Sequence, residues 1–254
     1  MQHKTRLTGW FCLFIACLCQ LNLSVAAESD TLRIMPIGDS LTQCSTPGYR
    51  MFLYRMLKQT PLLFDFVGVK HDTENEGEYD TDHSGFSGYT IGPGASLLDQ
   101  YDAWRQGNIL YHLDKGHCIL SSAPDVILLM IGINDFFNNL DTARYNPEVA
   151  GAERLDNLIY HIYRLLPRAC IVVSTITPLQ GDAHFADLFN SQVEEIALKY
   201  RKQGYRCVVA DMRNGIGWDK TDLGPDHLHP TASGYRKIAL NFFNVLQSLF
   251  LIKK

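Results

Sequence analysis

Apolar residues along the chain occur in two alternating patterns, short continuous runs and longer amphipathic stretches. The short runs are apolar on consecutive residues and bounded by Gly, Pro or Asp, which is typical of parallel strands covered on both faces. They predict strands at residues 32–37, 64–69, 126–131, 171–175 and 208–210.

The longer stretches carry apolar residues at helical spacing. They predict helices at residues 49–59, 95–106, 147–166, 187–202 and 231–251. In the third, one stripe contains Leu155, Leu158, Ile159, Ile162, Leu165 and Leu166. Strands that alternate with helices indicate an α/β fold with one parallel sheet and helices on both of its faces. Ligands bind such sheets outside the carboxyl ends of the strands, so the residues that follow each strand are the candidate functional residues.

The first 27 residues differ from the rest. Lys4 and Arg6 form a basic start, residues 10–19 are an apolar run, and residues 24–27 are small. This pattern is typical of a secretory signal peptide whose apolar run is too short to span a bilayer, although an uncleaved anchor is the alternative. We therefore expect cleavage after Ala27, a single domain over residues 28–254, and a secreted or periplasmic protein without stable membrane insertion.

Composition narrows the range of partners. The 254 residues include 23 Lys and Arg against 27 Asp and Glu, a formal net charge of −4, so no basic face for nucleic acid is indicated. A monomer is expected.

The four cysteines outside the predicted signal peptide permit two disulfides in an oxidising compartment, but a domain of this size does not need them. Their pairing is left open; they are Cys44, Cys118, Cys170 and Cys207.

Two segments that follow predicted strands carry candidate chemistry. Ser40 follows the first strand within Gly38-Asp39-Ser40-Leu41, where an exposed nucleophile would lie, although Asp39 and Ser40 are also suited to cap a helix. Asn134 follows the third strand within Gly132-Ile133-Asn134-Asp135, and its side-chain amide suits a developing oxyanion. A self-bonded Asn-Asp turn is the alternative there.

A third segment, Asp226-His227-Leu228-His229-Pro230, precedes the last predicted helix. The spacing of Asp226 and His229 lets the carboxylate orient the imidazole, which then accepts a proton from a serine. Metal binding and a helix-entry turn are the alternatives, and the metal is the weaker because no second His/Cys cluster has matching spacing. Together the three segments predict an acyl-transfer site.

Four segments in this order resemble the conserved blocks of SGNH (GDSL-type) hydrolases over residues 32–240. They are residues 38–41, 83–91, 132–135 and 226–230. The resemblance implies a flavodoxin-like three-layer α/β/α sandwich with a five-stranded parallel sheet. It also implies Ser40 as nucleophile, His229 as general base and Asp226 as the residue that orients it.

The same resemblance implies an oxyanion hole. Its donors would be the backbone N–H groups of Ser40 and Gly88 and the side chain of Asn134, with Gly85 in a similar context three residues before Gly88. No metal or organic cofactor is needed for this chemistry.

Residues 34–40, 48–50, 87–91 and 124–129 are similar to carbohydrate esterase family 3, although Ile133 stands where that family would have threonine. This implies a serine esterase that removes O-acetyl groups from carbohydrate, as acetylxylan esterases do, and the predicted signal peptide makes it a secreted one. Its substrate would be a small-molecule or polysaccharide acyl ester. One alternative is a periplasmic GDSL lysophospholipase or thioesterase with the same triad. Another is a non-catalytic glycan-binding protein on an esterase scaffold.

Several further residues are candidates for weaker roles. Substrate contacts are expected from Asp39, Tyr89, Asp135, Phe136 and Phe137. The two phenylalanines would narrow the mouth of the site, with core packing as the alternative. Trp104 and Trp218, with Tyr89, could stack on sugar rings or pack in the core. The alternating acids of residues 72–82 read as a solvated loop, with a calcium site as the alternative.

Overall fold

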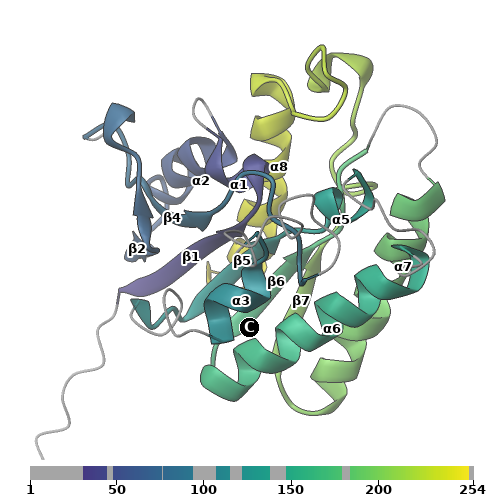
Figure 1. The fold of residues 1–254 in the computed structure, drawn as a ribbon. Coiled ribbons are helices and arrows are strands. Elements are labelled where there is room, and N and C mark those ends of the chain that lie inside the picture. Colours follow the sequence, from purple (N-terminus) through teal and green to yellow (C-terminus); the bar gives the residue numbers. More distant parts are fainter. Residues whose placement is uncertain are drawn as a thin grey trace, which may run out of the picture.

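A computed structural model of the chain describes residues 31–44, 48–75, 77–93, 107–114, 122–137, 147–178 and 184–251. Within these ranges a central sheet lies between two layers of helices (Figure 1). The strands are β1 (Leu32–Gly38), β2 (Phe64–Phe66), β3 (Lys70–His71), β4 (Asp82–Gly85), β5 (Val126–Met130), β6 (Cys170–Ser174) and β7 (Arg206–Ala210).

The sheet is mostly parallel. β1 pairs with β5, β5 with β6 and β6 with β7, all in parallel register. On its other side β1 pairs first with β2 and then, nearer its carboxyl end, with β4. β3 is antiparallel to β4. The predicted α/β fold and parallel sheet are confirmed, and β3 and β4 are additions to the five strands that the apolar runs predict.

The two helix layers cover opposite faces of the sheet. α2 and α8 lie together on one face, and α3, α6 and α7 lie on the other (Figure 1). The helices are α1 (Ser40–Gln43), α2 (Tyr49–Leu57), α3 (Ile109–Asp114), α5 (Ile133–Phe137), α6 (Pro147–Leu165), α7 (His184–Lys202) and α8 (Ala232–Leu246), with 3₁₀ turns η1 (Thr73–Asn75) and η4 (Lys220–Asp222) and a π-helical turn η5 (Gln247–Leu251). No helix within the described ranges is long and apolar enough to cross a bilayer.

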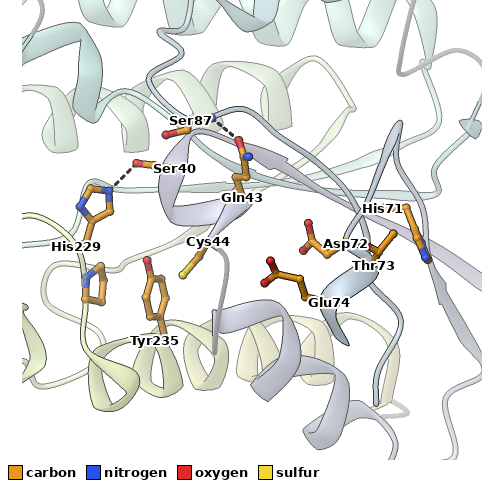
Figure 2. A pocket seen from close by; sticks show the side chains of 11 residues that line it. Ser40, Gln43, Cys44, His71, Asp72, Thr73, Glu74, Ser87, His229 and Tyr235 are labelled. Atoms are coloured by element: carbon orange, nitrogen blue, oxygen red, sulfur yellow. Dashed lines mark hydrogen bonds between the residues drawn. The ribbon is translucent and has the colours of Figure 1, made fainter. Parts of the chain in front are cut away.

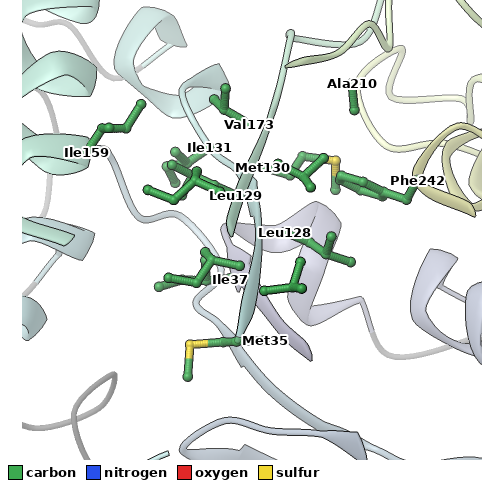
Figure 3. Packing of buried hydrophobic residues seen from close by; sticks show 14 of the residues in the cluster. Met35, Ile37, Leu128, Leu129, Met130, Ile131, Ile159, Val173, Ala210 and Phe242 are labelled. Atoms are coloured by element: carbon green, nitrogen blue, oxygen red, sulfur yellow. The ribbon is translucent and has the colours of Figure 1, made fainter. Parts of the chain in front are cut away.

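Side chains on both faces of the central strands are buried, as their consecutive apolar residues predict. Every residue of β5 and β6 is buried. Figure 3 shows Leu129 and Leu128 projecting to opposite sides, towards Ile159 of α6 and Phe242 of α8 respectively. On α6 the predicted stripe holds as far as Ile162, but Leu165 at the last residue of the helix is 37% exposed.

Two predicted elements end three or more residues early in the structure. β2 ends at Phe66 rather than residue 69, because a Cβ at Gly68 would lie 2.1 Å from the backbone of His83 and the chain there crosses β4 closely. The last helix ends at Leu246 and continues as η5. The helix predicted at residues 95–106 lies outside the described residues. The carboxyl ends of β1 and β5 remain beside each other, and both are followed by candidate site residues.

Candidate active site

Ser40 lies at the carboxyl edge of the sheet, on a sharp turn between β1 and α1. A Cβ at Gly38 would lie 1.9 Å from the carbonyl oxygen of Met130 in β5, so only glycine fits at the end of β1. Asp39 caps α1 by accepting a hydrogen bond from the N–H of Leu41 at 3.0 Å. The capping alternative is therefore correct for Asp39, and the cap places Ser40 in the first turn of the helix.

His229 lies in a loop between η4 and α8 that folds back on itself. The N–H of Gly224 donates to the carbonyl of His229 at 2.8 Å, and His227 adopts a left-handed conformation with φ of 59°. Asp226 accepts from the backbone N–H groups of Leu228 at 3.1 Å and His229 at 3.0 Å. These bonds fold the loop around the carboxylate of Asp226.

The loop brings Ser40, His229 and Asp226 into one hydrogen-bonded chain. Asp226 Oδ2 lies 2.7 Å from His229 Nδ1, and His229 Nε2 lies 2.9 Å from Ser40 Oγ (Figure 2). This is the arrangement in which an imidazole can take the hydroxyl proton of a serine.

The electrostatics of Asp226 fit this geometry. Partial burial alone would raise the pKa of Asp226, but the hydrogen bonds from the side chain of His229 and from two backbone N–H groups outweigh it and lower the pKa to about 2. A carboxylate only accepts hydrogen bonds, so Nδ1 of His229 carries the proton. Nε2 is then left as the acceptor for the hydroxyl of Ser40.

A tight turn after β4 contains Gly88, and α5 contains Asn134. The N–H of Tyr89 donates to the carbonyl of Phe86 at 3.1 Å, and Gly88 has φ of 77°. The amide Nδ2 of Asn134 donates to the carbonyl of Tyr89 at 2.9 Å and so joins α5 to this turn. Gly85 lies in β4 and not in this turn. A Cβ at Gly85 would lie 2.5 Å from the backbone N of Gln43, so a glycine there allows β4 to approach α1 closely.

A cavity of about 570 Å3 opens beside Ser40. Its lining is mainly polar, and Figure 2 shows these side chains coming from α1 and the residue after it, the turn after β4, the segment around η1, the loop before α8 and α8 itself. They are Ser40, Gln43, Cys44, His71, Asp72, Thr73, Glu74, Ser87, His229, Pro230 and Tyr235. The arrangement can therefore present an ester of a polar alcohol to Ser40.

Four of the residues expected to contact substrate are absent from the lining of this cavity; they are Asp39, Tyr89, Asp135 and Phe136. Asp39 and Asp135 are each 2% exposed, and burial raises the pKa of each to about 7. Tyr89 stacks on Phe86 with ring centroids 4.8 Å apart. Phe136 packs edge-on against Phe189 at 5.7 Å, as the core-packing alternative predicts. The side chain of Phe137 is outside the description.

The acidic segment is held by protein contacts. Asp72 bonds to Arg50 and to His83 Nε2 at 3.1 Å, and Asp80 accepts from the N–H of Phe66 at 2.7 Å. Asp82 bonds to His71 at 2.7 Å. Over the described residues no group of three or more candidate metal ligands is found.

Other candidates have structural contacts. Trp218 donates its indole N–H to the carbonyl of Met212 and packs against the core. Trp104 and Cys118 lie outside the described residues. The thiols of Cys44, Cys170 and Cys207 are free, so the structure contains no disulfide among these three cysteines.

Gln43 was not among the sequence-derived candidates, although it lines the cavity beside Ser40. Its position three residues after Ser40, one helical turn along α1, is the signal from which it could have been found. No comparable signal in the sequence predicts the three lining residues at and beside η1, because only the folded chain brings this segment to the cavity. They are Asp72, Thr73 and Glu74.

The fold, with Ser40, His229 and Asp226 in one hydrogen-bonded chain, has the arrangement expected of an SGNH-type acylhydrolase, and comparison with known proteins assigns the family. The model of the GDSL-like lipase/acylhydrolase family matches residues 37–237, so the chain belongs to that family. The chain is a carboxylic ester hydrolase.

Individual relatives are esterases. The chain is 30% identical over 232 residues to a multidomain esterase of Ruminococcus flavefaciens, covering 84% of this chain and 28% of that protein. It therefore spans about a quarter of the length of that relative. A family 3 carbohydrate esterase of Clostridium thermocellum matches with a TM-score of 0.66 and 27% identity over 86% of this chain and 98% of that one. An acetylxylan esterase of Geobacillus stearothermophilus, Axe2, shares the fold with a TM-score of 0.58 and 18% identity over 85% and 95% of the two chains.

Proposed function

We propose that this chain is a secreted serine esterase that removes O-acetyl groups from carbohydrate through an acyl-enzyme. The observation that carries the proposal is the Ser40–His229–Asp226 chain of hydrogen bonds opening into a polar cavity. A lining dominated by hydroxyl, amide, imidazole and carboxylate groups suits a hydroxyl-rich alcohol better than the chain of a lipid. The names of the carbohydrate esterases among its structural relatives support the same substrate class.

In the first half of the proposed reaction, Ser40 Oγ attacks the carbonyl carbon of the ester while His229 Nε2 takes the hydroxyl proton. The negative charge that develops on the carbonyl oxygen is met by the N–H groups of Ser40 and Gly88 and the amide of Asn134. The carbon–oxygen bond to the sugar then breaks, and His229 gives its proton to the leaving sugar oxygen.

In the second half, a water molecule attacks the acetyl-serine as His229 accepts one of its protons. The tetrahedral intermediate collapses, the proton returns to Ser40 Oγ, and acetate leaves. Asp226 remains a carboxylate throughout and stabilises the imidazolium that forms in each half.

Hydrolysis of 4-nitrophenyl acetate, butyrate and octanoate by the purified protein tests the proposal. We expect a preference for acetate, and Ser40→Ala should lower kcat by about 10³-fold or more. Ser191→Ala is the matched control, because Ser191 lies on α7 outside the cavity lining and its hydroxyl donates within its own helix, to the carbonyl of Leu188 at 2.7 Å.

Each other outcome rejects part of the proposal. A preference for octanoate indicates the lipid-directed alternative, and full activity of Ser40→Ala rejects the serine mechanism. The absence of turnover, together with binding to a glycan panel, indicates the non-catalytic alternative. A preference for acetate leads to acetylated xylan as the next substrate, with released acetate as the readout.

A further inference from the structure

The turn that contains Ser87 and Gly88 is tied to the helix that carries Ser40 by one side chain. Gln43 Oε1 accepts a hydrogen bond from the N–H of Ser87 at 2.7 Å (Figure 2). Gln43 is the last residue of α1 and Ser40 is its first, so nucleophile and acceptor are one helical turn apart. We infer that Gln43 is a positioning residue, which fixes the Gly88 N–H relative to Ser40 Oγ; this inference rests on the proposed function.

The orientation of the Gln43 amide is set by a second donor. Lys70 Nζ lies 3.1 Å from the same Oε1, and this ammonium also lies over the ring of Phe86 at 4.7 Å from its centroid. An ammonium and a backbone N–H both donate, so only the oxygen of the amide can face them. Lys70 therefore keeps the acceptor directed at Ser87.

Hydrogen bonds hold the turn on both sides of the residue that bonds Gln43. Before the turn, the N–H of Phe86 donates to the carbonyl of Gly38 at 2.8 Å. After it, the carbonyl of Tyr89 accepts from Asn134. Ser87 and Gly88 lie between these two attachments, and Gly88 has the left-handed conformation that favours glycine. The N–H of Ser87 belongs to the Phe86–Ser87 peptide, which directly precedes the peptide that carries the N–H of Gly88. Rotation of the Phe86–Ser87 peptide would change the direction of the Gly88 N–H, and the bond to Gln43 opposes this rotation.

The placement predicts an effect on the transition state rather than on substrate binding. An oxyanion donor acts where charge develops, so its misalignment lowers kcat and leaves KM nearly unchanged. Gln43→Met keeps the length of the side chain and removes the acceptor. We expect it to lower kcat for 4-nitrophenyl acetate by about 10- to 100-fold with KM within about threefold.

A boronic acid separates positioning from a general loss of structure. Its boron adds to Ser40 Oγ to form a tetrahedral anion, whose oxygen requires the same donors as the reaction intermediate. Gln43→Met should weaken boronate inhibition by a factor similar to its loss in kcat, with little change in Tm. Gln192→Met is the matched control, because Gln192 lies on α7 outside the cavity lining.

Lys70→Met supplies a second, milder variant. It should lower kcat and boronate affinity less than Gln43→Met does, and the double variant should be no worse than Gln43→Met alone.

Unchanged kcat in Gln43→Met, or a lower kcat with unchanged boronate affinity, overturns the inference. If Gln43→Met does not fold, Lys70→Met decides alone, and unchanged kcat and boronate affinity then overturn it. The proposed function fails separately, when the wild-type chain hydrolyses no ester or Ser40→Ala keeps its activity.

Discussion

At the scale of single residues, two aspartates beside the site show how environment sets ionisation. Asp226 has a half-exposed side chain that accepts three hydrogen bonds, and its pKa is lowered to about 2. Asp39 is fully buried, and burial, with a smaller contribution from Asp135, raises its pKa to about 7 despite the N–H of Leu41. The first carboxyl is charged wherever the esterase would act, and the second changes charge near neutral pH.

The raised pKa of Asp39 predicts a dependence of stability on pH. Between about pH 4 and pH 7 the folded state holds a proton on Asp39 that the unfolded chain has lost, so the free energy of unfolding falls as pH rises through this range. Asp39→Asn keeps an oxygen to cap α1 and removes the titration. The difference in unfolding free energy between this variant and wild type should be more favourable to the variant at pH 9 than at pH 5, by roughly 1–3 kcal/mol.

Urea unfolding at the two pH values measures this difference. Asp65→Asn is the control, because Asp65 is an exposed residue of β2. Burial lowers the pKa of His83 to about 4, so its contribution to stability is lost as pH falls below about 6.5, opposite to that of Asp39. Both proteins contain His83, so subtracting the unfolding free energy of wild type from that of the variant removes this contribution. Equal effects of Asp39→Asn at both pH values would contradict the prediction.

At the scale of elements, α1 is a helix of four residues that needs external support. Arg50 of α2, 1% exposed, supplies it by donating to the carbonyls of Thr42 at 2.8 Å and Gln43 at 3.1 Å. The same guanidinium donates to the carbonyl of Thr81 at 3.0 Å and pairs with Asp72. One buried side chain thus joins the helix of Ser40 to the residue just before β4 and to the cavity wall.

Removing this guanidinium should therefore cost far more than removing a surface arginine. Arg50→Met removes a donor from three carbonyls and leaves Asp72 with its bond to His83 alone among these two partners, and we expect a loss of roughly 3–5 kcal/mol of unfolding free energy. Arg55→Met on the same helix is the matched control, because Arg55 is 55% exposed and 3.9 Å from Glu78. The control should lose less than about 0.5 kcal/mol. A loss below about 1 kcal/mol for Arg50→Met, measured in urea, would refute this support role.

The elements that the sequence predicts well are those whose burial dictates their composition. β5 and β6 are apolar on consecutive residues because both faces are covered, and α6 shows its stripe because one face is. β4 reads Asp-His-Ser-Gly and owes its pairing to tertiary contacts, so hydrophobic patterning does not reveal it.

The same contrast holds at the site. Ser40, Asp226 and His229 are predictable from local spacing and from their order after strands, and the folded chain brings them together. The hydrogen bond of Gln43 to Ser87 joins residues 44 positions apart, and no local pattern in the sequence predicts that these two residues meet. Contacts of this kind depend on the close approach of α1 and β4 at Gly85.

At the scale of the whole molecule, the layered packing protects two thiols. Cys170 and Cys207 are both completely buried in neighbouring strands. The strand register sets Cys170 opposite Arg206 and Cys207 opposite Ile171, so the two cysteines are not directly paired. Burial raises the pKa of both thiols, that of Cys207 to about 12. Since the thiolate is the reactive form, both should resist oxidation while the fold is intact.

Alkylation with iodoacetamide, followed by peptide mass spectrometry, tests this protection. In the native protein we expect Cys44, half-buried at the cavity, to react first, and Cys170 and Cys207 to react only as fast as the whole domain unfolds. In denaturant without reductant, all three should react completely, and protein reduced beforehand is the control. Incomplete labelling that reduction restores would reveal a disulfide, and rapid native labelling of Cys170 or Cys207 would show that β6 and β7 open without global unfolding. Destabilising the molecule elsewhere, as Arg50→Met does, should accelerate both buried thiols together, because a single core holds the strands that contain them.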